Sequence, residues 1–259
     1  MLNLHPVPAF TDNYIWCLHD NQSAYVVDPG QADPVLDYLN DRALTLRGIL
    51  ITHHHWDHVS GIEALLQVFP GIPVWGPARE DIPCCSQPLA EGDQVNLDWG
   101  LVFRVLEVPG HTLGHIAYYA ETTPLGPLLF CGDTLFSSGC GRLFEGTPQQ
   151  MHQSLQALSV LPVETLVCCT HEYTTANLAF AQAVEPQNAA IQERIAQVAA
   201  LRDQNLPSLP SSIGLEQAVN PFLRVTQSTV LESLQQKCGE RPATEVESFA
   251  TLRHWKDNF

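Results

Sequence analysis

The sequence His53-His54-His55-Trp56-Asp57-His58 directly follows a short apolar run, Gly48-Ile49-Leu50-Ile51-Thr52. If the chain stays extended after that run, side chains two apart point the same way, so His53 and His55 can close on one metal ion. The chain must then turn, and Asp57 with His58 can reach a second ion. Imidazole and carboxylate ligands together suit zinc, iron or manganese, whereas magnesium and calcium prefer oxygen ligands. The run therefore predicts two neighbouring metal ions rather than an exposed polar loop.

Composition narrows the class of protein. The chain has 259 residues, 45% of them hydrophobic and 15% charged, as in ordinary globular proteins. Its formal charge of −16 argues against nucleic acid and anionic membranes as partners, because both reward clustered Lys and Arg. The start of the chain has neither a basic segment nor a long apolar segment of the secretory kind. The eight cysteines lack a disulfide framework, so reduced thiols in the cytoplasm are expected.

The first two thirds of the chain alternate short strand-like runs with turn signals. Strands are expected over residues 24–27, 48–52, 102–108, 128–131 and 165–169. Each run from residue 48 onward ends at a potential ligand, which is His53, His111, Asp133 or His171. Ligands on loops at strand ends, held by a buried sheet, would form a rigid two-metal site.

Helical patterns lie between and after these strands. Ser60 is expected to cap a helix with apolar residues at 62, 65, 66 and 69, and a second helix is expected over 147–161. From residue 174 the chain becomes predominantly helical, with Asn188 as a possible helix cap and a break at 207–210. We therefore predict two domains, 1–174 and 175–259.

Three later motifs carry further ligand-type residues. They are Pro109-Gly110-His111-Thr112-Leu113-Gly114-His115, Cys131-Gly132-Asp133-Thr134 and Thr170-His171-Glu172-Tyr173. With the histidine run they resemble the metallo-β-lactamase superfamily. The segments Phe10 to Trp16, Gly139 to Thr147 and Arg253 to Phe259 narrow this resemblance to glyoxalase II, the hydroxyacylglutathione hydrolases, over the whole chain.

The resemblance implies a ligand set for two divalent metal ions, with zinc the first expectation and iron or manganese open. His53, His55 and His111 would hold one ion, Asp57, His58 and His171 the other, and Asp133 would bridge both. His54 and Trp56 occupy variable places of the motif, and His115 is expected to support a ligand rather than bind metal. The remaining histidines without motif support are expected at the surface: His5, His19, His152 and His254.

Two metal ions can share a water and lower its pKa toward about 7, which would supply hydroxide to attack a thioester carbonyl. The ions would also stabilise the developing oxyanion. A thiol has a pKa of about 8.5, so a thiolate can leave without a strong general acid. The nitrogen of an amide would have to be protonated before it could leave. Asp57 is expected to hold metal and also to handle a proton of the water.

The same resemblance assigns a glutathione-binding site to Arg142, Phe144, Tyr173, Arg253 and Lys256. The cations among them would offset the acidic field of the chain for an anionic peptide thioester. Arg142 stands where many relatives have lysine, and Phe144 where some have tyrosine, so affinity for glutathione is open. From composition alone, the segment with Arg253 and Lys256 would be a frayed terminus.

The implied fold is α/β, a four-layer αβ/βα sandwich with a C-terminal α-helical domain. We expect the protein to be cytoplasmic and a monomer. The implied activity is hydrolysis of S-2-hydroxyacylglutathione, with S-D-lactoylglutathione as substrate, to glutathione and D-lactate, the second step of methylglyoxal detoxification. Alternatives are a persulfide dioxygenase, expected to hold a single iron, a β-lactamase, a nuclease, which would want a basic surface, and a scaffold that has lost catalysis. Which metals are bound in the cell, which oligomeric state forms and which acyl groups are accepted stay open.

Overall fold

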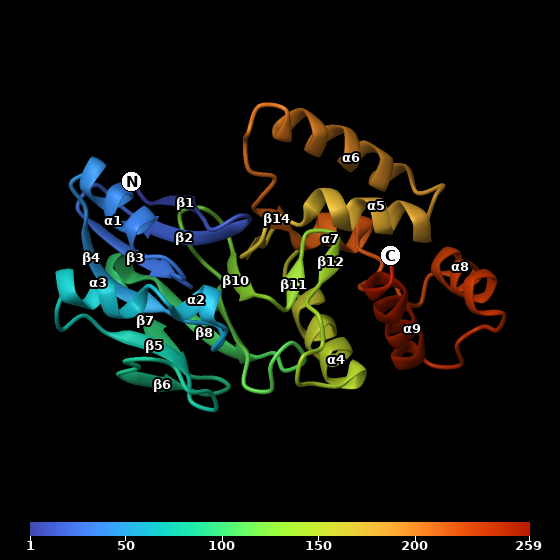
Figure 1. Cartoon of the computed structure of the whole chain (residues 1–259), viewed down its shortest axis with the longest axis horizontal. Coiled ribbons are helices and arrows are strands. Elements are labelled where there is room, and N and C mark those ends of the chain that lie inside the picture. Colours follow the sequence, from blue (N-terminus) through green and yellow to red (C-terminus); the bar gives the residue numbers. More distant parts are fainter. The chain divides into compact units, whose positions relative to one another are not determined.

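A computed structural model describes all 259 residues, which form two compact units. The first unit comprises Met1–Glu107, Gly114–Gly132 and Cys168–His171. The second comprises Val108–Leu113, Asp133–Val167 and Glu172–Phe259. Figure 1 labels most of the elements of both units along the chain.

The first unit is built on a six-stranded mixed sheet with the strand order β1-β2-β3-β4-β5-β6. Neighbours are antiparallel from β1 to β3 and parallel from β3 to β6. The strands are β1 (Asn3–Ala9), β2 (Asn13–His19), β3 (Ser23–Val27), β4 (Thr45–Leu50), β5 (Val74–Pro77) and β6 (Gln87–Leu89). The strand expected at 24–27 lies within β3, and the one expected at 48–52 overlaps β4, which begins three residues earlier and ends at Leu50.

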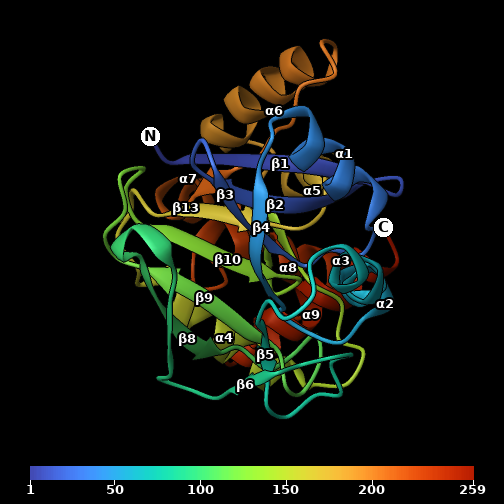
Figure 2. The same cartoon turned by 90° about the vertical axis from the view of Figure 1, so that its left-hand side faces the viewer.

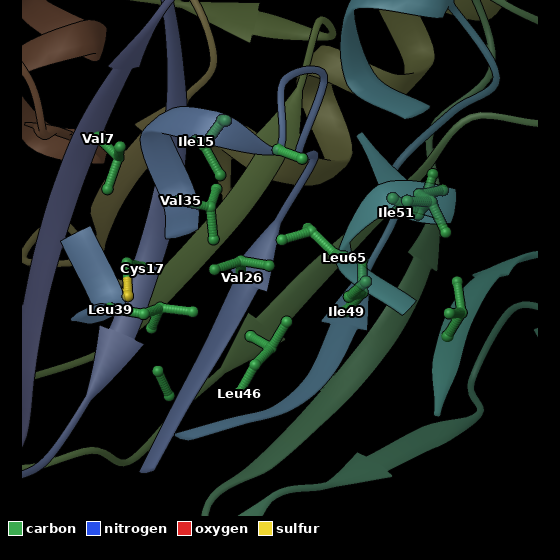
Figure 3. Close-up of a cluster of buried hydrophobic side chains, with 14 of the residues drawn as sticks. Val7, Ile15, Cys17, Val26, Val35, Leu39, Leu46, Ile49, Ile51 and Leu65 are labelled. Atoms are coloured by element: carbon green, nitrogen blue, oxygen red, sulfur yellow. The ribbon is translucent and has the colours of Figure 1, made fainter. Parts of the chain in front are cut away.

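Helices α1 (Asp33–Asp41) and α3 (Ile62–Val68) cover one face of this sheet (Figure 2). Each presents a buried apolar stripe, with Val35 and Leu39 on α1 and Ile62 and Leu65 on α3. These side chains pack with alternate residues of the strands in one buried cluster (Figure 3). The burial of this apolar surface anchors β4, whose end leads into the histidine run.

A second sheet contributes four strands to the first unit, in the order β7-β8-β9-β10 with antiparallel neighbours. They are β7 (Gln94–Asn96), β8 (Val102–Glu107), β9 (Ile116–Ala120) and β10 (Leu128–Gly132), and Figure 2 shows the last three side by side. The alternating burial of β8 matches the pattern read over 102–108. Strand β10 is buried throughout, as expected for the run 128–131.

The histidine run lies between β4 and the short helix α2 (Trp56–Val59). The expected cap at Ser60 is wrong, because α3 begins after Gly61 and no side chain caps it. Ser60 instead ends α2, where its hydroxyl donates to the Trp56 carbonyl. The change of direction needed after His55 is therefore made by a helical turn of its own.

The second unit is predominantly helical. Its helices are α4 (Pro148–Ser159), α5 (Thr174–Val184), α6 (Ala189–Arg202), α7 (Ile213–Val219), α8 (Ser228–Cys238) and α9 (Glu245–Asp257). Thr147 caps α4 reciprocally with Gln150, and the Asn188 side chain accepts from the Ala190 N–H at the start of α6. The expected break at 207–210 separates α6 from α7.

Two short strand pairs complete this unit. Strands β11 (Leu135–Phe136) and β12 (Gly139–Cys140) form a hairpin directly after Asp133. Strand β13 (Leu166–Cys169) pairs through Leu166 and Val167 with β14 (Ser211–Ser212). The hairpin and α5 carry many of the residues considered next.

Candidate metal centre and pocket

The first unit gathers five of the seven predicted metal ligands. His53 Nε2 lies 3.1 Å from His55 Nδ1, which places the two side chains on the same side of the chain. The His53 and His58 ring centroids are 4.1 Å apart, and both residues are buried. The ring nitrogens of imidazoles packed this closely can coordinate one metal ion or two neighbouring ions.

Asp57, His58 and His171 form one group whose ligand atoms all lie within 4.8 Å of one another. The Asp57 carboxylate Oδ2 lies 3.6 Å from His58 Nε2 and 3.5 Å from His171 Nε2. His171 follows β13, and the neighbouring Thr170 carbonyl accepts from the Tyr14 N–H at 2.7 Å. Residues 57 and 171, far apart in sequence, therefore lie side by side in the first unit.

Three further polar residues hold these ligands, and sequence reasoning gave none of them a role. His171 Nδ1 lies 2.7 Å from Asp12 Oδ1, and the Asn13 amide donates to Asp57 Oδ2 at 3.0 Å. Asp28 accepts from the Thr52 N–H and hydroxyl, and its Oδ2 lies 3.2 Å from His58 Nδ1. The sequence offers two signals for these residues, the adjacent pair Asp12-Asn13 and the turn Asp28-Pro29-Gly30. In the structure Asp28 has a φ of 54° in that turn.

His54 and Trp56, the two remaining residues of the histidine run, contact other side chains, and His115 of the later motif packs behind a predicted ligand. Trp56 is 64% exposed, and its ring meets that of Phe10 edge to face. The His54 ring contacts Glu80. His115 is buried and stacks on His53 with ring centroids 4.6 Å apart, a position suited to supporting that ligand.

The second unit contains the remaining two predicted ligands, His111 and Asp133. His111 Nε2 lies 3.4 Å from Asp133 Oδ2. On its other side, His111 Nδ1 lies 2.9 Å from the carbonyl oxygen of Arg142. An N–H at Nδ1 donating to that carbonyl leaves Nε2 with its lone pair beside Asp133, the tautomer a metal ligand needs.

His111 and Asp133 line a pocket of about 480 Å³ that lies entirely within the second unit. All five residues predicted to bind glutathione also line it: Arg142, Phe144, Tyr173, Arg253 and Lys256. The Phe144 ring packs edge to face against His111, and the Tyr173 ring against Phe136. The pocket thus joins two candidate metal ligands to three cationic side chains.

The C-terminal cations are ordered by α9 rather than frayed. Arg253 is buried and donates through Nη1 to the Cys140 carbonyl at 3.0 Å, while Nη2 meets Asp257 Oδ1 at 2.8 Å. Lys256 Nζ donates to the Ala176 carbonyl at 3.1 Å. Burial, followed by the charges of Arg253 and Arg142, lowers the pKa of Lys256. This local crowding of positive charge suits an anionic ligand.

A buried polar network in the second unit supports the pocket and was not predicted. The Glu216 carboxylate of α7 accepts from the Ser138 N–H at 2.7 Å and from the Asn220 amide at 3.0 Å. The same amide donates to the carbonyls of Phe136 and Gly139. These bonds hold the β11–β12 hairpin, in which Ser138 has a φ of 58°. Nothing in the sequence near 216 signals this role.

The ligand types fit a metal centre. The clusters offer imidazole nitrogens and carboxylate oxygens without a cysteine, a donor set suited to zinc, iron or manganese. With this fold, these histidine and aspartate clusters indicate that the chain binds divalent metal.

Comparison with known proteins gives the class first. The model of the metallo-β-lactamase superfamily matches residues 10–84 and 86–171. The model of the hydroxyacylglutathione hydrolase C-terminus matches residues 172–259. Hydroxyacylglutathione hydrolases from Albidiferax ferrireducens and Pseudomonas aeruginosa are each 53% identical to the chain, with all of both proteins covered. The chain therefore belongs to the metallo-β-lactamase superfamily and, within it, to the hydroxyacylglutathione hydrolase family.

Solved structures confirm the fold class. ETHE1 from Myxococcus xanthus has a TM-score of 0.63 at 23% identity and covers 99% of both chains, a likeness of fold alone. TTHA1623, solved in a di-iron-bound form, has a TM-score of 0.59 at 27% identity and covers 85% of this chain and 100% of that one. The predicted α/β, metallo-β-lactamase-like fold is thus confirmed, and the boundary predicted at residue 174 stays a prediction. None of the helices combines the length and apolar character needed to cross a membrane.

Proposed function

We propose that the protein is a binuclear metal-dependent thioesterase that hydrolyses S-2-hydroxyacylglutathiones, S-D-lactoylglutathione foremost, to glutathione and the hydroxy acid. The observation that carries this proposal is that one pocket is lined both by the cations Arg142, Arg253 and Lys256 and by His111 and Asp133. Full-length similarity to proteins named hydroxyacylglutathione hydrolase supports it. We propose that this reaction is the second step of methylglyoxal detoxification.

The proposed ligand assignment follows the family motif. His53, His55 and His111 would hold one ion, Asp57, His58 and His171 the other, with Asp133 between them. When bound, two such ions supply hydroxide at neutral pH and stabilise an oxyanion. We expect zinc, with iron or manganese as the alternatives, and metal analysis of natively expressed protein decides among them.

The residues around these ligands orient them and manage protons. Asp12 and the Arg142 carbonyl accept from the Nδ1 atoms of His171 and His111, which keeps each Nε2 free of its proton. We propose that Asp57 Oδ2, which the Asn13 amide holds, also accepts a proton from the attacking water. Asp57→Asn should lose turnover, and full turnover with both metals retained would rule out this second role.

The pocket supplies the affinity for the peptide part of the substrate. Glutathione carries two carboxylates, while the chain as a whole has a net charge of −16. Nearby cations outweigh a distant field that is screened beyond about 8 Å at physiological salt. Phe144 and Tyr173 provide apolar walls, and the departing thiolate needs no strong acid.

The decisive experiment removes two cations of this pocket. Arg253→Ala combined with Lys256→Ala should raise the KM for glutathione thioesters by about tenfold or more, because the substrate carboxylates lose charged donors. Metal content should stay normal. Lys237→Ala is the matched control, because Lys237 is the chain's other lysine and lies over Trp255 instead of in the pocket. An unchanged KM in the double variant would contradict the assignment.

Two assays separate the competing classes. A chelator should abolish thioester turnover and added zinc should restore it, whereas a scaffold would show no turnover at any metal loading. Oxygen consumption with glutathione persulfide would instead identify a dioxygenase.

All eight cysteines are free thiols, which supports the expected cytoplasmic location. Light scattering tests the expectation of a monomer.

A further inference from the structure

Glu80 lies in the loop after β5, and its carboxylate is only 3% exposed. One oxygen, Oε2, accepts from the His54 N–H at 2.6 Å and lies 2.9 Å from His54 Nδ1. The other oxygen, Oε1, accepts from the Gly114 N–H at 3.1 Å. A single carboxylate therefore holds backbone atoms of two separate loops.

Both loops carry proposed metal ligands within three residues of the anchored residue. His54 stands between His53 and His55, so fixing its N–H fixes the peptide that joins the two ligands. Gly114 follows His111 by three residues and precedes His115, whose ring stacks on His53. Metal ligands must be held to within about 0.5 Å, and backbone anchors are an effective way to do so.

The close approach of the second loop explains its glycine. A Cβ atom on Gly114 would lie 2.4 Å from Glu80 Cγ and 3.1 Å from the Arg79 carbonyl carbon. The first distance is shorter than any normal contact, so a larger residue would push the loop away from the carboxylate. The close approach of this loop to the Glu80 side chain therefore requires a glycine at position 114.

We propose that Glu80 is a positioning residue that sets the spacing of the two ligand loops, with His54 as its partner. This inference rests on the metal site of the proposed function. It gives a role to His54, which the family motif leaves variable. It acts through the peptide backbone on either side of the anchored residues.

The test compares Glu80→Gln and Glu80→Ala with the control Glu107→Gln, which removes a charge that pairs with neighbouring Arg79. Zinc dissociation constants are measured by equilibrium dialysis on chelated, refilled full-length protein. Glu80→Ala should weaken zinc binding about 10- to 100-fold. Glu80→Gln should fall between it and the unaltered protein, since its amide keeps one acceptor. Glu107→Gln should bind as the unaltered protein does.

Amide hydrogen exchange on the metal-free protein gives a second readout. The His54 and Gly114 amides should exchange faster in Glu80→Gln, while amides of α1 should not change. At saturating zinc the KM for the thioester should stay normal, which a general structural defect would not allow. Unchanged zinc binding in Glu80→Ala together with unchanged exchange in Glu80→Gln would overturn the inference. If the unaltered protein bound no metal, the proposed function would fail, and the exchange result would still test the anchor.

Discussion

Asp12 Oδ1 lies 2.7 Å from the Nδ1 atom of His171, although 159 positions separate the two residues. The bond fixes the imidazole of His171 so that Nε2 faces Asp57. The loop between β1 and β2 therefore orients His171, a proposed ligand of the second metal ion.

Replacement of Asp12 by alanine should weaken metal binding about 10- to 100-fold, because His171 loses the group that selects its tautomer and orientation. Isothermal titration of the metal-free protein with zinc measures this effect. Asp37→Ala, on the exposed side of α1, serves as the matched control. Equal zinc affinity in the two variants would show that His171 needs no such support.

Gly139 and Asn177 should be energetically coupled. A Cβ atom at Gly139 would lie 2.5 Å from the Asn177 amide nitrogen, which donates to the Ser137 carbonyl at 3.0 Å. We expect Gly139→Ala to cost about 1–3 kcal/mol of unfolding free energy through this overlap. In an Asn177→Ala background the cost should shrink by about 1 kcal/mol, since the clashing amide is gone. Denaturant unfolding of the four proteins measures the coupling, and simple additivity would refute it.

Loss of the Glu216 carboxylate should destabilise the second unit strongly. Glu216→Ala leaves the buried Ser138 N–H and the buried Ser211 hydroxyl without their acceptor, which should cost about 3 kcal/mol or more. Glu232→Ala on the exposed side of α8 should change stability by less than about 0.5 kcal/mol. Urea denaturation compares the two variants, and similar midpoints would argue against a supporting network.

Burial raises the pKa of Glu216 above its ordinary value of 4.5, against the opposing effect of its hydrogen-bond donors. A carboxyl group with a raised folded-state pKa stabilises the fold below its unfolded pKa and loses that contribution as the pH rises through the folded one. Glu216 should therefore contribute a fall in stability as the pH rises from about 4.5 through its folded pKa. This fall should be absent in Glu216→Ala.

The KM for a glutathione thioester should rise with pH earlier than an ordinary lysine would allow. Burial and the neighbouring arginines lower the pKa of Lys256 below 10.5, so its positive charge is lost at a lower pH. In Lys256→Arg the guanidinium stays charged throughout the range in which Lys256 loses its proton, and the rise should disappear. A pH profile of KM under conditions where metal content is constant measures this difference. Identical profiles would mean that Lys256 does not bind the substrate carboxylates.

The sequence was most informative where a local pattern decided the structure. The strand overlapping the apolar run 48–52, the Asn188 cap and the helix that follows Thr147 are all indicated by neighbouring residues. Strands β1 and β2 were not predicted, because Pro6 and Pro8 interrupt the first, which is an edge strand, and β2 is buried on both faces and does not alternate.

Tertiary contacts account for the remaining misses. His19 and His152 were expected at the surface but are buried, where His19 meets the Tyr38 hydroxyl and His152 meets Glu245. The partners of such residues lie far away in sequence, so no spacing could reveal them. The same holds for Glu80 and Glu216, each of which looks like an ordinary acidic residue until its backbone donors are known.

The make-up of the second unit bears on how such enzymes can be recombined. The family match for the C-terminus begins at residue 172, yet the compact unit that contains the pocket also includes Val108–Leu113 and Asp133–Val167. A chimera spliced at residue 172 would place a foreign α9 against the native β11–β12 hairpin. The bond between Arg253 of α9 and the Cys140 carbonyl of the hairpin would then have to form between parts of two different proteins. Transplanting substrate preference between relatives therefore calls for exchanging three stretches of chain together, and a graft of the terminal segment alone should yield a metal-loaded enzyme with a mismatched pocket.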